Sequence, residues 1–264
     1  MNSDASGSSQ AAAEPAFVCV PDGVDLPHLP DPGHWDVRRR RASWRRAATS
    51  AARPSTVVLD IGGVLVPSLF ESVRGVDRPF PPGPLTGDAE YAQVERGEIG
   101  EREYWQRIGE QGWDVGRLWR ECSSVRTLLW KVLAVAGRRM RLVAFTNDMA
   151  HWFGPDWLAR FPQLAELDLI LEASELGVLK PAPEAFRRAL AVIGERPAQC
   201  LMVDDHPANL NGATSVGMPT LQFDVGDPEG SVEALRQTLA LPAAERPTVF
   251  RVPARRSPAP THHI

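Results

Sequence analysis

The sequence predicts an α/β fold, namely a doubly wound parallel sheet with a small inserted α-helical cap. Between residues 55 and 241, five short apolar runs alternate with segments of helical period, which is typical of strands joined by helices. The runs are continuously apolar, as expected for a parallel sheet that is covered on both faces. The first two runs are separated by far more residues than one crossover helix needs, which indicates an insertion.

The strands and their connecting helices can be placed from the apolar runs and the helix-end residues. The clearest helix begins at Pro183, which suits a first helical turn, and ends at Gly194, which suits a C-terminal stop. Phe186, Leu190 and Ile193 fall on one face of that helix. Two further helices, each followed by a glycine, are expected at residues 125–136 and 208–216. The five strands are expected at residues 56–61, 142–146, 167–171, 200–203 and 219–223.

The insertion is expected to be a helical cap at about residues 67–124. It is rich in charged and aromatic residues, with helical spacing around Trp105 and Leu118. Gly97 and Gly100 bracket a break between two helices. We expect the cap beside the carboxyl ends of the strands, where open α/β sheets bind ligands.

The two ends of the chain differ from the predicted hydrolase domain at residues 55–241. Residues 1–54 are expected to be a disordered extension, because they are rich in Ser, Ala, Gly and Pro, and residues 242–264 a flexible tail. Six arginines between Arg38 and Arg46 form a basic run, which is either an arm for phosphate-bearing partners or a solvated segment. The net charge is −4, so a nucleic-acid partner is not expected.

Composition excludes several classes of protein. No apolar run approaches the roughly 20 residues that span a bilayer, and the first residues lack the pattern of a secretory leader. The three cysteines are widely spaced, so a disulfide framework and a thiolate zinc site are not expected. We therefore expect a soluble cytoplasmic protein without a membrane partner.

Polar residues follow several of the predicted strands. Asp60 ends the first strand and is followed by Gly62 and Gly63, a pattern that serves either a ligand site or an ordinary turn. Thr146 and Asn147 end the second, where they either bind an anion or cap a helix.

A lysine and two acids complete the set. Lys180 stands between a strand and a helix, and the prolines that follow it stiffen the chain. Asp204 and Asp205 end the fourth strand, where a hard cation such as magnesium would relieve their repulsion, although a helix cap is the simpler alternative. Because parallel strands end at one edge, these groups can converge on one pocket, where they suit phosphoryl transfer.

With these motifs in order, the region from Thr56 to Phe223 resembles the haloacid dehalogenase (HAD) superfamily of hydrolases. The matching segments are Val-Leu-Asp-Ile-Gly-Gly around Asp60, Phe-Thr-Asn around Thr146, Leu-Lys-Pro around Lys180, and Met-Val-Asp-Asp-His-Pro-Ala-Asn from Met202. The insertion is similar to the helical cap of the sugar-phosphatase-like and dehalogenase-like branches.

The resemblance implies a role for each metal-site residue. Asp60 would be the nucleophile that forms an aspartyl-phosphate. Asp60, the carbonyl of Gly62 and Asp205 would hold Mg²⁺, with Asp204 adjacent and Asn209 supporting them.

The resemblance also implies how the phosphoryl group is held. Thr146 and the amide of Asn147 would bind its oxygens, and Lys180 would neutralise charge between Asp60 and the phosphoryl group. The function implied is a magnesium-dependent phosphomonoesterase that acts on a small phosphorylated metabolite.

One departure from the family pattern affects the activity. Most phosphatases of the superfamily carry a second aspartate two positions after the nucleophile, which protonates the leaving group, and here that position is Gly62. Either the substrate has a good leaving group, or His206, His151 or a cap carboxylate donates the proton. An aspartate introduced at position 62 is expected to raise activity on poor leaving groups.

Two alternatives to a phosphatase remain. One is a catalytically weak module that binds a phosphate ligand or regulates a partner, and the other is a metal-independent 2-haloacid dehalogenase. The acidic pair favours phosphate over halide. Three cap tryptophans either line the substrate pocket or form the cap's core, namely Trp105, Trp113 and Trp119.

Overall fold

The computed structural model describes residues 54–72, 80–81, 83–85 and 88–242. Except for residues 54 and 242, the predicted disordered extension and flexible tail, with the arginine run, lie outside the described residues. In the part of the chain that is described, no helix combines the length and the apolar character that crossing a bilayer requires.

A five-stranded parallel sheet forms the centre of the described fold, with strand order β3-β2-β1-β4-β5. All five strands were predicted, with small differences at their ends. The first strand ends at Leu59 rather than at residue 61, because the chain turns back so that Val66 N–H donates to the carbonyl of Ile61 at 2.8 Å. The strands are β1 Thr56–Leu59, β2 Arg141–Thr146, β3 Leu169–Glu172, β4 Cys200–Asp204 and β5 Thr220–Gln222.

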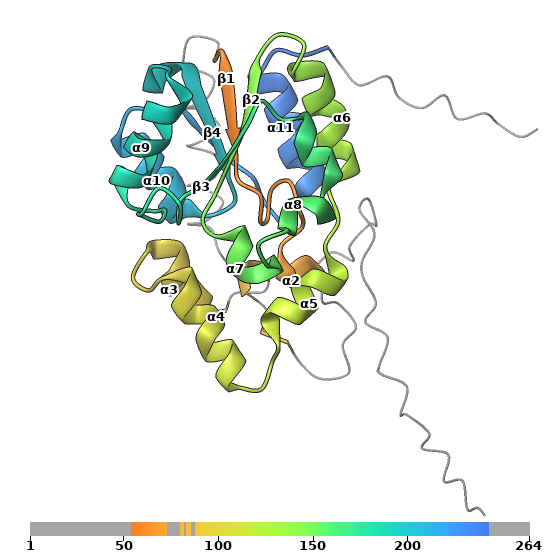
Figure 1. The fold of residues 1–264 in the computed structure, drawn as a ribbon, viewed down its shortest axis with the longest axis vertical. Coiled ribbons are helices and arrows are strands. Elements are labelled where there is room, and N and C mark those ends of the chain that lie inside the picture. Colours follow the sequence, from red (N-terminus) through yellow and green to blue (C-terminus); the bar gives the residue numbers. More distant parts are fainter. Residues whose placement is uncertain (1–53, 73–79, 82, 86–87, 243–264) are drawn as a thin grey trace, which may run out of the picture.

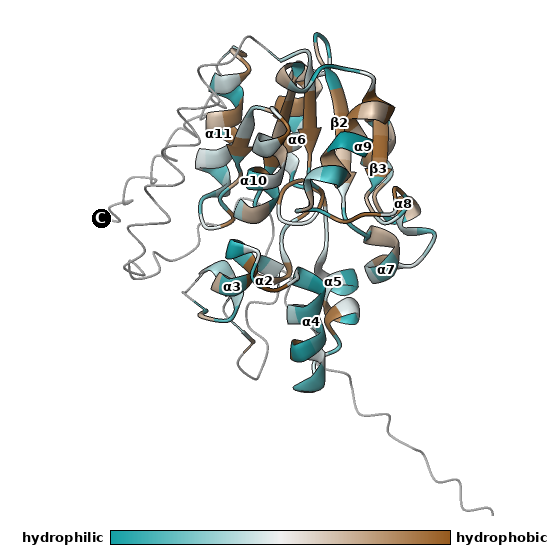
Figure 2. Ribbon diagram, turned by 90° about the vertical axis from the view of Figure 1, so that its left-hand side faces the viewer, coloured by the Kyte–Doolittle hydropathy of each residue, from teal (hydrophilic) through white to brown (hydrophobic). Residues whose placement is uncertain are grey.

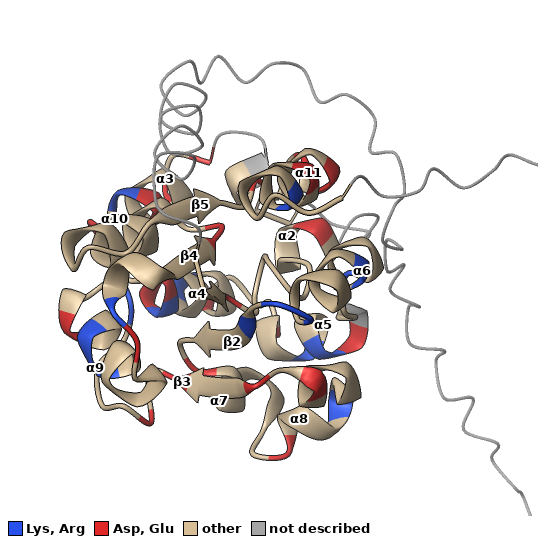
Figure 3. Cartoon of the chain, turned by 90° about the horizontal axis from the view of Figure 1, so that it is seen from above, with Lys and Arg blue, Asp and Glu red and all other residues tan. Residues whose placement is uncertain are grey.

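Helices cover both faces of the sheet, which confirms the doubly wound architecture (Figures 1 and 3). One face packs against α6 (Thr127–Ala136) and α11 (Pro228–Thr238), and the other against α9 (Pro183–Ile193) and α10 (Pro207–Ser215). The remaining helical segments on the sheet side of the molecule are α7 Met149–Phe153, α8 Trp157–Arg160, and the 3₁₀ turns Pro162–Glu166 and Pro197–Gln199.

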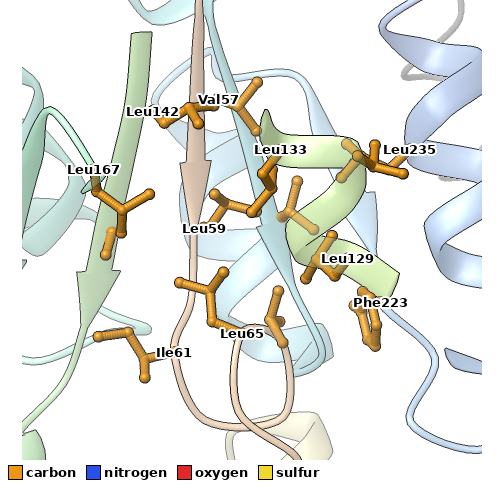
Figure 4. Packing of buried hydrophobic residues seen from close by; sticks show 14 of the residues in the cluster. Val57, Leu59, Ile61, Leu65, Leu129, Leu133, Leu142, Leu167, Phe223 and Leu235 are labelled. Atoms are coloured by element: carbon orange, nitrogen blue, oxygen red, sulfur yellow. The ribbon is translucent and has the colours of Figure 1, made fainter. Parts of the chain in front are cut away.

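The apolar residues of the central strand alternate between the two cores. Val57 and Leu59 pack with Leu133 of α6 and Leu235 of α11, as Figure 4 shows, whereas Val58 packs on the α9 side. All five of these side chains are at most 1% exposed. Because successive residues of a strand point to opposite faces, one short apolar run supplies both cores.

The helix ends follow the predicted signals in part. Pro183 begins α9, and Gly194 ends it in the left-handed conformation at φ 77°. Helix α6 begins at Thr127, two residues later than predicted. The preceding residue, Arg126, is extended and donates its backbone N–H to the carbonyl of Leu65, which keeps it out of the helix.

The insertion lies at the carboxyl ends of the strands (Figures 1 and 2). Gly97 ends α3 in the left-handed conformation and Gly100 is the N-cap of α4, as predicted. A further helix, α5, contains Leu118, around which helical spacing was noted in the sequence, and the side chain of Asp114 caps it by accepting from the N–H of Arg117. The elements are α2 Leu69–Ser72, the 3₁₀ turn Gly83–Leu85, α3 Tyr91–Arg96, α4 Glu101–Glu110 and α5 Val115–Cys122.

The insertion has an apolar core of its own. Phe70, Tyr91, Tyr104 and Trp105 stack edge to face or tilted, with ring centroids 4.8–6.2 Å apart. Offset and edge contacts of this kind are favourable between aromatic rings. Figure 2 shows that α4 is otherwise largely hydrophilic, whereas β2 and β3 are apolar. The insertion therefore packs through a small cluster of aromatic rings and aliphatic side chains rather than through a long apolar face.

Candidate active site

A pocket lies between the carboxyl edge of the sheet and the helical insertion. Its floor comes from the strand ends and its roof from the insertion. Five of the predicted site residues line the floor, namely Asp60, Gly62, Thr146, Asn147 and Asp205. The roof includes Phe70, Tyr91, Glu101, Trp105 and Trp119. Two further predicted residues, Lys180 and Asp204, lie just beneath the floor. Lys180 contacts Asp60, and Asp204 contacts Lys180.

Lys180 connects the two aspartates at the centre of the floor. Its Nζ lies 3.0 Å from Asp60 Oδ2 and 2.8 Å from Asp204 Oδ2, and it donates to the carbonyl of Phe145 at 3.0 Å. These three acceptors match the three protons of an ammonium group. Although burial lowers the pKa of Lys180, the two carboxylates raise it above its usual value, so the lysine is charged.

The side chain of Asn147 fixes the backbone of Lys180. Its Oδ1 accepts from the backbone N–H of Lys180 at 2.8 Å, and its Nδ2 donates to the carbonyl of the same residue at 3.3 Å. From sequence, Asn147 was expected either to bind an anion or to cap a helix. Its contact with the backbone of Lys180 was not predicted, because a hydrogen bond between residues 147 and 180 leaves no periodic signal in the sequence.

The two acids at the end of β4 have different surroundings. Asp204 is fully buried, and besides Lys180 its oxygens accept from His206 N–H at 2.9 Å and Asn209 Nδ2 at 3.0 Å. Asp205 is partly buried and faces the pocket. Burial raises the pKa of Asp205 well above its usual value, and the charges of Asp204 and Asp60 raise it further. Asp204 is thus an internal anchor, whereas Asp205 is exposed to a ligand.

The acidic residues of the floor fit a divalent cation. Asp60, Asp204 and Asp205 offer carboxylate oxygens that all lie within 4.8 Å of one another. Oxygen ligands of this kind suit Mg²⁺. Burial also raises the pKa of Asp60 to about 7, with Lys180 opposing and Asp204 adding to the effect. A cation would relieve the cost of bringing these charges together.

The loop after β1 requires both of its glycines. Gly63 has φ +76°, and a Cβ on it would lie 2.2 Å from Asp205 Oδ2. A Cβ on Gly62 would lie 3.0 Å from Cη2 of Trp119, whose indole reaches down from α5. The place where most phosphatases of the superfamily carry an acidic side chain is therefore covered by an aromatic ring.

A buried ion pair supports the same loop. Arg126 Nη2 lies 2.6 Å from Glu71 Oε1, and both side chains are nearly inaccessible. Arg126 Nε also donates to the carbonyl of Val64 at 3.0 Å. The pair thus joins α2 and the start of α6 to the turn that follows Asp60. Neither residue was predicted from sequence, although an arginine at the start of an apolar helical run was a usable signal.

Two of the three sources considered for a proton have surroundings that disfavour that role. His206 lines the pocket, and burial lowers its pKa to about 4, so the ring is neutral. His151 is exposed on α7 and does not line the pocket. The third source, a cap carboxylate, is represented by Glu101, which lines the pocket and accepts from Nε1 of Trp105 at 3.2 Å.

The three cap tryptophans divide between pocket and core. Trp105 and Trp119 line the pocket, and Trp105 also belongs to the apolar core of the insertion. Trp113 packs against Phe80 in that core, with ring centroids 4.9 Å apart, and does not line the pocket. Both interpretations of these aromatic residues are therefore correct for part of the set.

Two curated proteins share part of this sequence. Acyl-CoA dehydrogenase family member 10 of Mus musculus is 24% identical over 208 residues, which cover 70% of this chain and 19% of that protein. Ribulose-1,5-bisphosphate 5-phosphatase of Halopiger xanaduensis is 36% identical over 93 residues, which cover 35% of this chain and 39% of that enzyme. The chain thus spans well under half the length of either relative.

A solved structure has the same fold. The HAD-hydrolase YfnB from Bacillus subtilis, bound to magnesium, superposes with a TM-score of 0.52 and 15% identity, over 72% of this chain and 100% of that one. A family model described as haloacid dehalogenase-like hydrolase matches residues 54–217, which is more than half of the chain. That match contains Asp60, Thr146, Lys180 and the acidic pair, so the protein belongs to the haloacid dehalogenase-like hydrolases.

Proposed function

We propose that the protein is a magnesium-dependent phosphomonoesterase that acts through an aspartyl-phosphate on a small phosphorylated metabolite. The observation that carries this proposal is the contact of Lys180 with both Asp60 and Asp204, beside a second acid, Asp205, that faces the pocket. A nucleophilic carboxylate, a fixed cation and a metal-binding acid are the groups that phosphoryl transfer requires. The similarity to a phosphatase from Halopiger xanaduensis supports the same class of substrate.

Asp60 is the proposed nucleophile because its carboxylate is held in one orientation. Its Oδ1 accepts from the N–H of Ile61 at 2.7 Å, and its Oδ2 contacts Lys180. The carboxylate attacks the phosphorus, so an O–P bond to Asp60 forms as the ester P–O bond breaks. Water then attacks the same phosphorus and breaks the bond to Asp60, which releases inorganic phosphate and restores the carboxylate.

The proposed metal ligands are Asp60, Asp205 and the carbonyl of Gly62, with Asp204 adjacent and Asn209 holding Asp204. When bound, Mg²⁺ would supply positive charge to the phosphoryl oxygens and fix their position. Because burial raises the pKa of Asp60 to about 7, positive charge beside it would favour the ionised form that a nucleophile needs.

Thr146 and Lys180 are the proposed partners of the phosphoryl group, together with the backbone amide of Asn147. Thr146 is nearly buried at the end of β2 and lines the pocket with Asp60. Lys180 lies beneath Asp60, where its charge offsets the negative charge gathered at the nucleophile. Groups fixed in this way stabilise developing charge without having to reorganise.

The second candidate function is a phosphate-ligand binding module with weak turnover. It is favoured by the indole of Trp119 over Gly62, which leaves the floor of the pocket without the acid that most relatives carry. A metal-independent dehalogenase has less support, because the carboxylates of Asp204 and Asp205 lie beside the nucleophile and would repel a departing halide.

The test is phosphate release from a panel of phosphomonoesters and acyl phosphates, with Mg²⁺ and with a chelator. We expect release that needs Mg²⁺ and is lost in Asp60→Asn, which keeps the size of the side chain but removes the nucleophile. Asp156→Asn, at an exposed aspartate away from the pocket, is the control and should behave as the wild type. Release that persists in Asp60→Asn would contradict the assignment. If the wild type releases phosphate from no compound of the panel, the binding module is favoured. Halide release without Mg²⁺ would favour the dehalogenase.

A further inference from the structure

We propose that Glu101, on the first turn of α4, donates the proton to the leaving-group oxygen and so replaces the acid that is missing at Gly62. This inference rests on the proposed phosphomonoesterase function and assigns its general acid. The floor of the pocket has no side chain at position 62, and the indole of Trp119 occupies the space beside it. A proton donor therefore has to come from another part of the pocket.

Glu101 is placed and oriented for this role. It lines the same pocket as Asp60 and Thr146, but from the roof, where the part of a substrate beyond its phosphoryl group would lie. Nε1 of Trp105, one turn further along α4, donates to Glu101 Oε1 at 3.2 Å and limits where the carboxylate can point. Trp105 is only 7% exposed and is packed in the core of the insertion, so the donor itself is fixed.

Within the described part of the chain, Glu101 has no cationic partner that would hold it ionised. The adjacent Arg102 forms its ion pair with Asp148 instead. Asp148 also accepts from Nε1 of Trp152 at 3.2 Å. Of these two neighbouring acids, Asp148 is therefore held by a cation and an indole, whereas Glu101 is held by the indole of Trp105.

The other titratable groups that line the pocket are less suitable. Asp60 and Asp205 are the proposed nucleophile and metal ligand. Burial lowers the pKa of His206, which keeps the ring neutral and without a second proton to donate. Burial raises the pKa of Tyr91 well above its usual value, which makes its hydroxyl a poor acid.

The surroundings of Glu101 favour its protonated form. Although the residue is exposed at the pocket rim, the protein around its carboxyl group removes water and raises the pKa above its usual value. The indole of Trp105 opposes this shift, and the charge of Asp148 at the start of α7 adds to it. Of the charges below the pocket, Asp204 raises the pKa and Lys180 lowers it. A carboxyl group with a raised pKa is suited to act as a general acid near neutral pH.

The proton balance of both steps is complete. As the Asp60 O–P bond forms and the ester P–O bond breaks, the Glu101 carboxyl group gives its proton to the leaving oxygen, which departs as an alcohol. In the second step, the Glu101 carboxylate takes a proton from the water that attacks the phosphorus. Glu101 is then protonated again, and Asp60 is released as a carboxylate.

The test is the dependence of kcat/KM on the leaving group in Glu101→Gln. Glutamine keeps the shape and the acceptor for Trp105 but has no acidic proton. We expect roughly a 10²–10⁴-fold loss for alkyl phosphates, whose alkoxides need a proton, and at most about a threefold change for p-nitrophenyl phosphate and acetyl phosphate. On alkyl phosphates, wild-type activity should fall as the pH rises through the pKa of Glu101, and this fall should be absent in the variant.

The matched control is Glu103→Gln on the same helix, where the glutamate is exposed and paired with Arg107. It should behave as the wild type with every substrate. A loss in Glu101→Gln that is equal for alkyl and p-nitrophenyl phosphates would indicate a structural role and overturn this inference while the phosphatase stands. If the wild type hydrolyses neither ester nor acetyl phosphate, the proposed function fails, and the inference fails with it.

Discussion

The floor and the roof of the pocket are built on different principles. In the floor, Asp60, Lys180 and Asp204 are at most 9% exposed, and each is held by at least two hydrogen bonds or ion pairs. In the roof, Trp105 and Trp119 belong to a small insertion whose core is made of aromatic rings and aliphatic side chains. Hydrogen bonds and ion pairs thus fix the floor residues at the ends of the strands, whereas side-chain packing within the insertion fixes the roof residues.

This difference between the floor and the roof predicts which of them determines stability and turnover and which determines the choice of leaving group. A charge network that is buried and fully paired changes little with the ligand, because moving any member leaves another charge unpaired. A roof of indoles and one exposed carboxylate can differ in shape and protonation without disturbing the sheet. We therefore expect substitutions in the floor to affect both stability and all turnover, and substitutions in the roof to affect the choice of leaving group.

The largest effect is expected from Lys180→Met, which removes the cation from the floor. Asp60 and Asp204 would then be buried without the cation that contacts both of them, which should lower the free energy of unfolding by about 3–5 kcal/mol. Lys180 lowers the pKa of Asp60, so the substitution raises it further. A raised carboxyl pKa favours the folded state at low pH, and this stability is lost as the pH rises through the folded-state value. The deficit should therefore grow as the pH rises above about 7, where Asp60 ionises in the wild type but not yet in the variant, as urea denaturation would measure.

The control for this prediction is Lys131→Met, which changes the only other lysine of the sequence. Lys131 is exposed on α6, so its loss should change the free energy of unfolding by no more than about 0.5 kcal/mol. A deficit for Lys180→Met that shrinks with rising pH would contradict the buried-charge explanation.

A smaller effect is expected from Asp205→Asn, which changes the acid that faces the pocket. Burial and the charges of Asp204 and Asp60 disfavour the ionised form of Asp205, so its neutral replacement should raise the melting temperature of the metal-free protein. Saturating Mg²⁺ stabilises the wild type by about 2.7 kcal/mol at a hundred times its Kd, and the variant should lose this response. A thermal melt with and without Mg²⁺ measures both effects, and Asp156→Asn is again the control. An unchanged Mg²⁺ response would remove Asp205 from the proposed ligands.

The floor could be predicted from sequence because its residues carry local signals. Each strand is a short apolar run, and Asp60, Thr146 and the acidic pair directly follow or end such runs. Parallel pairing then brings the strand ends together, whatever the details of the loops. The five strands and the α/β class were therefore confirmed, with differences of one or two residues at the ends.

The roof and its contacts could not be predicted in the same way. Trp119 lies over Gly62 and Arg126 pairs with Glu71, although each pair is more than 50 residues apart in sequence. Such contacts depend on how the insertion packs, and no period or spacing in the sequence records them.

The smallest effect is expected from Gly62→Asp, which brings the family's usual acid into the floor. From sequence alone, this substitution should raise activity on poor leaving groups. The structure places Cη2 of Trp119 3.0 Å from the new Cβ, so the single variant should displace the indole and lose about 1–3 kcal/mol of stability without gaining activity. Trp119→Phe shortens the ring and opens this space, and the double variant should gain turnover of alkyl phosphates.

The double variant also separates the acid of the floor from the acid of the roof. If an aspartate at position 62 protonates the leaving group, adding Glu101→Gln to the double variant should cost far less than it costs the wild type, because one acid then replaces the other. Measuring kcat/KM on one alkyl phosphate through this cycle gives the coupling between positions 62 and 101. If Glu101→Gln lowers kcat/KM by the same factor in the wild type and in the double variant, the carboxylates at positions 62 and 101 have different roles. The proposal that Glu101 replaces the acid missing at position 62 would then be wrong.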